Sequence, residues 1–244
     1  MPKGYGQFCP VAKAAEVFAE RWTPLVLREL CRGCSQFNEI HAGVPLMSRT
    51  LLAQRLKELA WAGVVDAVPK PSGRGHSYRL STAGLAFCPI IDQLSDWGTL
   101  WARQRIGPED CDPGFLLWAL RGHADPRFLP DERFVIAFEF RDMPRGARFR
   151  TRWWLVAEDH ELDACWEDPG FPVDVDVRAS LPAMVAVWLG FEGLGTAERR
   201  GVVELHGERQ AIALTKRLLD LRDRPIAKRF HVAPAMPATA AALS

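Results

Sequence analysis

Residues 48–66, SRTLLAQRLKELAWAGVVD, constrain the fold of this chain more than any other stretch. Leucines recur at the spacing of one helical face, at Leu52, Leu56 and Leu59. Ser48 before them and Gly63 after them are residues typical of the two ends of a helix. The opposite face carries polar side chains, so this helix is predicted to pack on one side and to contact a partner with the other.

The segments around this helix occur in a recognisable order. Residues 11–32 are predicted to form two helices separated at Thr23-Pro24, and a short helix is expected between Ser35 and Pro45. Two β-prone pieces flank the loop PKPSGRGH and predict a hairpin with a basic tip. A long helix is predicted from Ser81-Thr82 to about Arg105. Helix, short helix, turn, longer helix and basic hairpin form the order of a winged helix-turn-helix.

This order assigns candidate DNA contacts. Thr50, Gln54 and Lys57 are expected to reach base edges in a major groove, and Ser48 and Arg49 suit phosphate at the positive end of the helix. For Arg55, nearer the buried edge, two roles stay open: a DNA backbone contact or an internal ion pair. The hairpin offers the adjacent backbone or minor groove Lys70, Arg74, His76 and Arg79. The alternative is an ordinary solvated surface, but three features in this order favour DNA.

Composition and charge agree with such a protein. The 244 residues are 48% hydrophobic and 25% charged, which excludes disordered and fibrous classes. The net charge is +1, yet residues 1–107 hold 13 Lys and Arg against 8 Asp and Glu, so the acidic excess lies in the remainder. The start lacks a signal peptide and no apolar run is long enough to span a membrane. We therefore expect a cytoplasmic protein with no membrane partner and with reduced cysteines.

Gly107-Pro108 and the acidic, proline-containing residues after it predict a domain boundary. The predicted domains are 1–107, for DNA binding and dimerisation, and 108–231, for sensing or ligand binding, followed by a loose tail at 232–244. The second domain has alternating strands such as FVIAFEF, RFRTRWWLVAE and VDVDVR, then a helix at SLPAMVAVWLGF, a strand at GVVELHG and a closing helix. The fold class is therefore α+β, with an antiparallel second domain.

The runs CPVAKAAEVFAERWTPLVLRELCRGCSQFNEI, PLMSRTLLAQRLKELAWAGVVD, GRGHSYRLSTAGLAF and DQLSDWGTLWA resemble the HxlR-type winged-helix transcriptional regulators over about residues 8–105. The resemblance implies a homodimer on a palindromic operator in double-stranded DNA, paired through the first helix and the helix after the hairpin. Trp97, Leu100 and Trp101 on that later helix need cover that one small domain does not supply, which agrees with this pairing.

The cysteines raise two questions. Cys9 occupies a position where several family members carry a thiol that responds to oxidants or electrophiles, and its place at a helix start suits a reactive thiolate. The alternative is a small buried cysteine without a sensing role. Cys31 and Cys34 have the spacing of a metal-binding pair, but no second pair completes a zinc site, so they are expected merely to pack. We predict no metal and no cofactor.

The order of elements in the second domain, closing with ELHGERQAIALTKRLL, resembles the sterol-carrier-protein type of lipid-binding fold. Six aromatic residues are candidates for lining a cavity for a small hydrophobic ligand: Phe138, Phe140, Trp153, Trp166, Trp188 and Phe191. They would otherwise fill the core. A ligand that prefers one dimer geometry would change the separation of the two DNA-reading helices and so the operator affinity.

Other function classes remain as alternatives. The sequence contains no G-x-S-x-G, no H-E-x-x-H and no glycine-rich phosphate loop, and EDHELD around His160 is typical of a charged turn between strands, so no enzyme is predicted. The rival prediction is a carrier of lipids or hydrophobic ligands whose first domain only dimerises. The charge excess and the basic hairpin favour the DNA-binding regulator.

Overall fold

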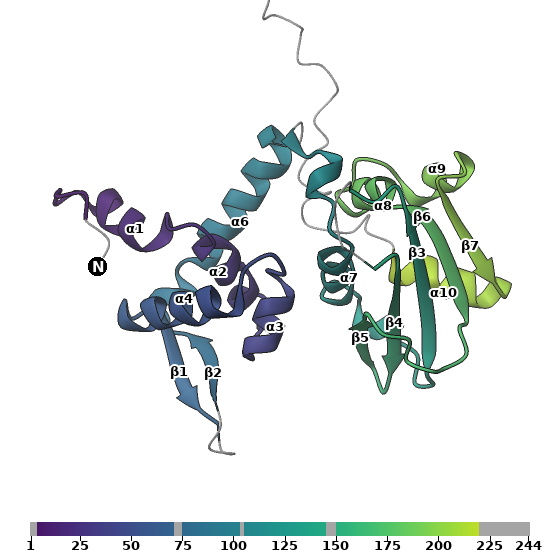
Figure 1. Ribbon diagram of the computed structural model, residues 1–244, viewed down its shortest axis with the longest axis horizontal. Helices are drawn as coiled ribbons and strands as arrows, with labels where there is room; N and C mark the ends of the chain where they lie inside the picture. The colour runs from purple at the N-terminus through teal and green to yellow at the C-terminus, as the bar shows by residue number, and fades with distance from the viewer. Residues whose placement is uncertain (1–3, 71–74, 103–104, 145–149, 220–244) are drawn as a thin grey trace, which may run out of the picture.

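A computed structural model of the chain describes residues 4–70, 75–102, 105–144 and 150–219. Two hydrophobic clusters organise it, one built from residues between Val26 and Ile91 and one from residues between Cys111 and Leu219. Figure 1 shows the corresponding two lobes, with α7 (Pro113–Arg121) between α3 and the sheet of the second lobe. The two separate clusters support the predicted domain boundary near Gly107, which stays an interpretation.

Four helices open the chain: α1 (Pro10–Phe18), α2 (Thr23–Cys31), α3 (Phe37–Ala42) and α4 (Arg49–Trp61). The two helices predicted over residues 11–32 are confirmed. The break between them lies at Trp22, whose backbone is left-handed with φ of 77°, while Thr23 is already the first residue of α2 and does not cap it. The helix after Ser48 is also confirmed, and it ends before Gly63, which has a φ of 72°.

The predicted hairpin consists of β1 (Val65–Pro69) and β2 (His76–Leu80), paired antiparallel from Val65 opposite Leu80 to Pro69 opposite His76. We call it the wing. The long helix predicted after it is wrong as a single element. The structure has α5 (Thr82–Leu85), α6 (Cys88–Trp97) and a π-helical segment at Gly98–Ala102. Pro89 explains the first break, since proline lacks an amide hydrogen and suits the start of a helix.

The second lobe contains a five-stranded sheet in the order β5-β4-β3-β6-β7. Its strands are β3 (Phe134–Arg141), β4 (Arg152–Glu158), β5 (Glu161–Cys165), β6 (Val175–Ser180) and β7 (Val203–Gly207). Neighbours are antiparallel except the central pair β3 and β6, which is parallel, so a purely antiparallel sheet was a wrong prediction. Asp159 and His160 form the turn between β4 and β5 with positive φ, confirming the predicted charged turn.

Helices α7, α8 (Leu181–Trp188) and α10 (Arg209–Leu218) share the larger hydrophobic cluster with the sheet, and the short α9 (Leu194–Arg199) contributes Ala197. Short 3-10 turns lie at Pro108–Asp110 and Pro126–Phe128. The sequence did not predict α7 or α9. Its last helix extends beyond α10 into residues outside the described ranges, as does the whole predicted tail at 232–244. Within the described ranges, no helix is long and apolar enough to cross a membrane.

Candidate nucleic-acid interface

Helix α4 is anchored through its leucines. Leu52 and Leu56 are fully buried and Leu59 nearly so, within the core of the first lobe. The Ser48 hydroxyl accepts a hydrogen bond from the Leu51 amide and so caps the helix. On the opposite side Thr50, Gln54 and Lys57 are exposed, as is Trp61. The chain itself therefore leaves the predicted DNA-reading face of α4 open.

The candidate contacts on α4 differ in how they are held. Arg49 donates to the Asn38 side chain at 2.7 Å, and its guanidinium lies 5.0 Å from the ring centre of Phe37, so α3 orients it at the start of α4. Gln54 donates to Glu58 at 3.0 Å. The side chains of Thr50 and Lys57 make no hydrogen bond or ion pair with another residue of the described ranges. These two side chains, and Gln54 after rotation, are free to meet a ligand.

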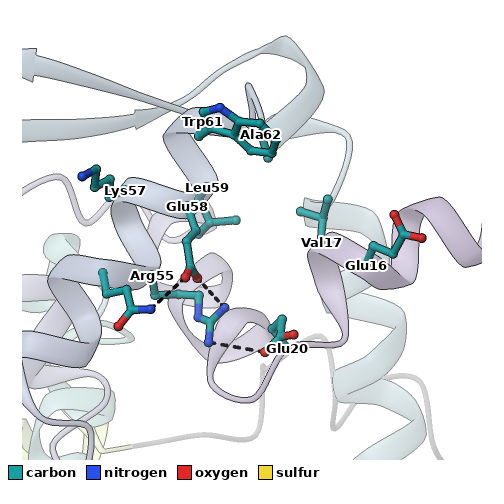
Figure 2. Close-up of a pocket in the computed structure, with 10 residues that line it drawn as sticks. Glu16, Val17, Glu20, Arg55, Lys57, Glu58, Leu59, Trp61 and Ala62 are labelled. Atoms are coloured by element: carbon teal, nitrogen blue, oxygen red, sulfur yellow. Dashed lines mark hydrogen bonds and ion pairs between the residues drawn. The ribbon is translucent and has the colours of Figure 1, made fainter. Parts of the chain in front are cut away.

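Arg55 belongs to an internal ion pair, the second of its two predicted roles. Its side chain is mostly buried and lies 2.6 Å from Glu58 and 3.6 Å from Glu20. Figure 2 shows these contacts at the edge of a hollow of about 660 Å³ between α1 and α4. Gln54, Lys57 and Trp61 line the same hollow from α4. Its guanidinium neutralises carboxylates beside the exposed face, and a contact of Arg55 with DNA stays a prediction.

The wing is fixed to the helices at its base. The Tyr78 amide donates to the Ser35 carbonyl at 2.8 Å, and an isolated bridge joins Gln36 to Ser77. His76 and Arg79 are exposed and Lys70 is half-buried beside them. Arg74 lies outside the described ranges. Three of the four predicted wing contacts are therefore on a hairpin that is joined to the segment just before α3.

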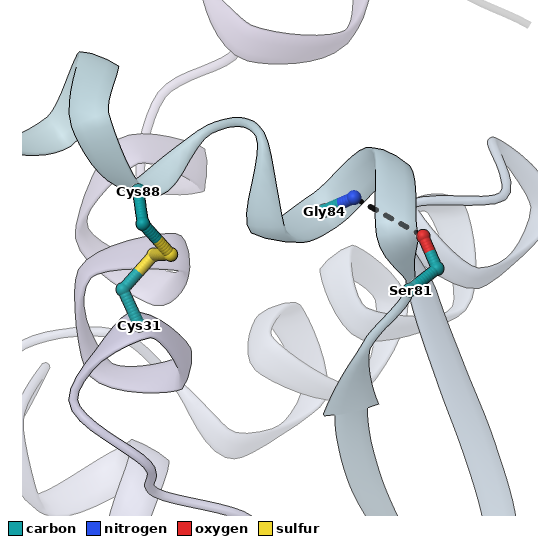
Figure 3. The surroundings of a disulfide bond; sticks show 4 residues. All are labelled: Cys31, Ser81, Gly84 and Cys88. Atoms are coloured by element: carbon teal, nitrogen blue, oxygen red, sulfur yellow. Dashed lines mark hydrogen bonds between the residues drawn. A yellow bond between two sulfur atoms is a disulfide. The ribbon is translucent and has the colours of Figure 1, made fainter.

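Gly84 explains why the wing exit approaches the helices so closely. A side-chain carbon at this position would lie 2.1 Å from the Val64 carbonyl oxygen, so only glycine fits. Ser81 caps α5 by accepting from the Gly84 amide at 3.1 Å, and its hydroxyl donates to the Gly63 carbonyl at 2.7 Å. Figure 3 shows this cap beside the disulfide described next.

Cys31 and Cys88 form a disulfide with their α-carbons 5.6 Å apart, which joins the end of α2 to the start of α6 (Figure 3). The prediction of reduced cysteines, and of Cys31 as a packing residue, is wrong for this pair. Cys88 lies 57 residues after Cys31, and no local pattern in the sequence shows that the fold places it against α2. Cys9 is a free, half-buried thiol at the N-cap of α1, and its sensing role stays a prediction.

Sequence reasoning missed a buried carboxylate behind the interface. Glu29 of α2 is fully buried, accepting from Arg28 at 2.6 Å and from the indole N–H of Trp118 at 2.9 Å. Burial, with Glu29 and Glu39 nearby, raises the pKa of the Cys34 thiol to about 11. Burial also lowers the pKa of Arg32. The available signal was a glutamate on the apolar face of α2, three residues after Val26.

The six aromatic candidates for a ligand cavity do not converge. Phe138 and Phe140 are stacked within the core and almost fully buried. Trp188 packs edge-on against His123, Trp153 donates to the Arg150 carbonyl, and Trp166 is 58% exposed. Phe191 lines a hollow of about 370 Å³ between α8 and the segment around Pro108. Which of them contact a ligand stays a prediction.

An apolar surface remains uncovered on α1 and α6. Helix α1 has no buried residue, and Phe8 just before it is fully exposed. Apolar side chains exposed on α6 and the π-helical segment are Ile90, Leu94, Trp97 and Trp101.

In the described ranges, no group of three or more histidine, cysteine, aspartate or glutamate residues is arranged to hold a metal ion.

Comparisons with known proteins converge on one family. A profile of the HxlR-like helix-turn-helix family matches residues 17–106. The chain is 36% identical over 113 residues to the HTH-type transcriptional regulator YvaP of Bacillus subtilis, covering 45% of this chain and 95% of YvaP. It is 37% identical over 123 residues to the HTH-type transcriptional regulator Rv3095 of Mycobacterium tuberculosis, covering 49% and 73% respectively. The reduced form of the regulator YodB from B. subtilis aligns with a TM-score of 0.35 and 27% identity, over 40% of this chain and 98% of YodB.

Proposed function

Since the chain belongs to the HxlR-like helix-turn-helix family of transcriptional regulators, we propose that it binds double-stranded DNA as a homodimer through α4 and the wing. The observation that carries this proposal is the exposed polar face of a leucine-anchored helix beside a basic hairpin. In each protomer Thr50, Gln54 and Lys57 read base edges in a major groove. The start of α4 and the wing contact phosphates on either side.

The dimer is proposed to form through the uncovered apolar surface of α1 and α6. Exposed apolar patches of this kind mark interaction surfaces in proteins of this size. Two copies related by a two-fold axis would present two α4 helices to successive major grooves. Such an arrangement fits a palindromic site with half-sites about 10 base pairs apart.

Selection of duplexes from a randomised pool by the purified protein tests the function. At a fixed salt concentration of roughly 0.1 M, chosen because phosphate contacts make affinity salt-dependent, the parent should enrich an inverted repeat. A Gln54→Ala, Lys57→Ala variant should lose the enrichment, whereas Lys216→Ala, in the second lobe, should keep it. Enrichment of no motif by the parent would contradict the proposal.

Two modes of regulation extend the proposal. The first is thiol chemistry at Cys9, supported by its position at the N-cap of α1 on the proposed dimer surface. Diamide treatment should change the affinity of the parent for its selected duplex and leave a Cys9→Ser variant unaffected. An equal response of both proteins would remove Cys9 from the account and leave the other free thiols, Cys34, Cys111 and Cys165, as the candidates for the response.

The second mode is a small hydrophobic ligand in the second lobe, whose strand order we relate to the sterol-carrier-protein type. The hollow lined by Val185, Leu189 and Phe191 supports this, since it lies where the segment joining the two lobes meets α8. The probe 1-anilinonaphthalene-8-sulfonate should bind saturably and lose its fluorescence with Val185→Glu. Unchanged binding by that variant would place hydrophobic binding elsewhere or exclude it.

A further inference from the structure

Helix α7 connects the second lobe to the helix-turn-helix by two specific side-chain contacts. The indole N–H of Trp118 donates to a carboxylate oxygen of Glu29 in α2 at 2.9 Å. The ring of Phe115 lies 4.8 Å from the guanidinium of Arg28. On its other side α7 packs on β4 and β5 (Figure 1). Trp118 and Phe115 of the second lobe therefore contact Glu29 and Arg28, two residues that are adjacent in α2.

The buried carboxylate of Glu29 depends on hydrogen-bond donors from Arg28, Arg32 and Trp118. Its side chain is fully buried, and a buried carboxylate is costly unless hydrogen-bond donors surround it. One oxygen accepts from Arg28 at 2.6 Å and from Arg32 at 3.3 Å, and the other accepts from Trp118. Among the described residues, removal of the Trp118 donor would leave that second oxygen with only the weak thiol of Cys34 at 3.9 Å.

Arg28 carries the connection to the turn before α4. The Arg28 Nε donates to Glu29, and its Nη2 donates to the carbonyl of Gly43, the residue immediately after α3, at 2.6 Å. A side-chain carbon at Gly43 would lie 2.2 Å from the Glu29 carboxyl carbon, so the turn and Glu29 share one tightly filled space. From Gly43 the chain has five residues before α4 begins at Arg49. A shift of Glu29 therefore acts directly on the segment that sets the direction of α4.

We propose that Trp118 is a positioning residue for DNA binding. Its N–H holds Glu29, and through Glu29 the Arg28 side chain, in the geometry that fixes the turn at Gly43 and the orientation of α4. The second lobe thereby controls operator affinity through the placement of α7. This inference rests on the proposed function and adds a connection between the sensing lobe and the DNA-reading helix that the helix-turn-helix alone does not contain.

Trp118→Phe tests the inference, because it removes the N–H and keeps an aromatic ring. The probe is the duplex that the parent selects from the randomised pool. We expect its dissociation constant to rise by about tenfold, within the range usual for coupled sites. The matched control is Trp154→Phe, the same substitution in the same lobe at a buried indole N–H without a partner in the described ranges. The control should bind the duplex as the parent does.

A double-mutant cycle separates positioning from simple loss of stability. If Trp118 acts through Glu29, Glu29→Gln should also weaken binding, and the double variant should be no worse than the more damaging single variant. Independent effects that multiply in the double variant would overturn the inference. Circular dichroism checks the fold of each variant. If Trp118→Phe is unfolded, the same cycle is made with Phe115→Leu and Arg28→Lys, with the same two readings.

The outcomes distinguish this inference from the function beneath it. A parent that selects no duplex overturns the proposed function and the inference together. A parent that binds its duplex while Trp118→Phe binds equally well overturns the inference alone, and the second lobe is then only tethered to the DNA-binding unit.

Discussion

Glu29 occupies a position where the helical spacing of α2 favours a leucine, between Val26 and Leu30 on the buried face. The carboxylate lies there among two arginines and a tryptophan, which together offset the cost of burying its charge. Arg55 behaves in a similar way beside α4, where it pairs with Glu20 and Glu58. Glu29 and Arg55 thus make ion pairs within the first lobe, whereas the exposed side chain of Lys57 stays available for a partner.

At this scale the wing provides a first prediction. Arg79→Ala should weaken binding to all duplexes to a similar extent and reduce the slope of log affinity against log salt by about 0.9, since one phosphate contact is lost. Fluorescence anisotropy titrations at several salt concentrations measure this. Arg199→Ala, on α9 in the second lobe, is the control. An unchanged slope would show that Arg79 does not contact phosphate.

The thiol of Cys34 gives a prediction of pH dependence. Its pKa is raised to about 11 from an ordinary value of 9.0, so below that pH the folded protein keeps it protonated. Because the thiolate is the reactive form, iodoacetamide at pH 8 should label Cys34 roughly a hundred times more slowly in the folded protein than in urea. Peptide mass spectrometry measures both rates. Equal rates would mean that Cys34 is neither buried nor near Glu29 in solution.

At the scale of elements, the sequence predicted the helices and hairpin that have strong periodicity and clear end signals. Helix α4 has a serine cap, a leucine face and a glycine stop, and all three are where the sequence placed them. Helix α7 was missed because Pro113-Gly114 indicated a boundary, whereas Pro113 is the first residue of a helix capped by Asp112. The parallel pairing of β3 with β6 depends on long-range packing that no local pattern encodes.

The disulfide between α2 and α6 is the element-scale feature that yields a prediction. It closes a loop over a separation of 57 residues, for which the chain-entropy estimate is about 4 kcal/mol of stabilisation. The double variant Cys31→Ser, Cys88→Ser should therefore unfold at markedly lower urea concentration.

Cys165→Ser, at a free half-buried cysteine of the second lobe, is the control for that comparison. A peptide containing Cys31 linked to Cys88 should also be found in digests made without reductant. Full alkylation of both cysteines in the untreated, unfolded protein would contradict the bond.

For the whole molecule, two lobes with separate cores are joined through α7, and the uncovered apolar surface lies on α1 and α6 of the first lobe. The sequence predicted the exposed polar face of α4 from local spacing. It did not predict how α7 meets α2, because residues 29 and 118 are 89 positions apart and only the fold brings them together. Within the described ranges the six aromatic candidates do not converge for a similar reason, since alternation along a strand does not tell core from cavity.

Oligomeric state is predicted at this scale. Trp97→Glu combined with Trp101→Glu should convert a dimer into a monomer, since two charges on the apolar surface oppose its burial. Sedimentation velocity measures the change. Trp166→Glu is matched in exposure, at 58% like Trp97 and Trp101, and should leave the dimer intact. A parent that sediments as a monomer at micromolar concentration would exclude the proposed dimer.

The central claim is that the outer face of α4 enters a major groove. Dimethyl sulfate methylates guanine N7, which lies in that groove, so protection of the selected duplex reports the contact directly. The account predicts protected guanines in both half-sites with the parent, and loss of protection at one position in each half-site with Lys57→Ala, since lysine donates to guanine O6 and N7. Protection that is absent with the bound parent, or identical with the variant, would contradict it.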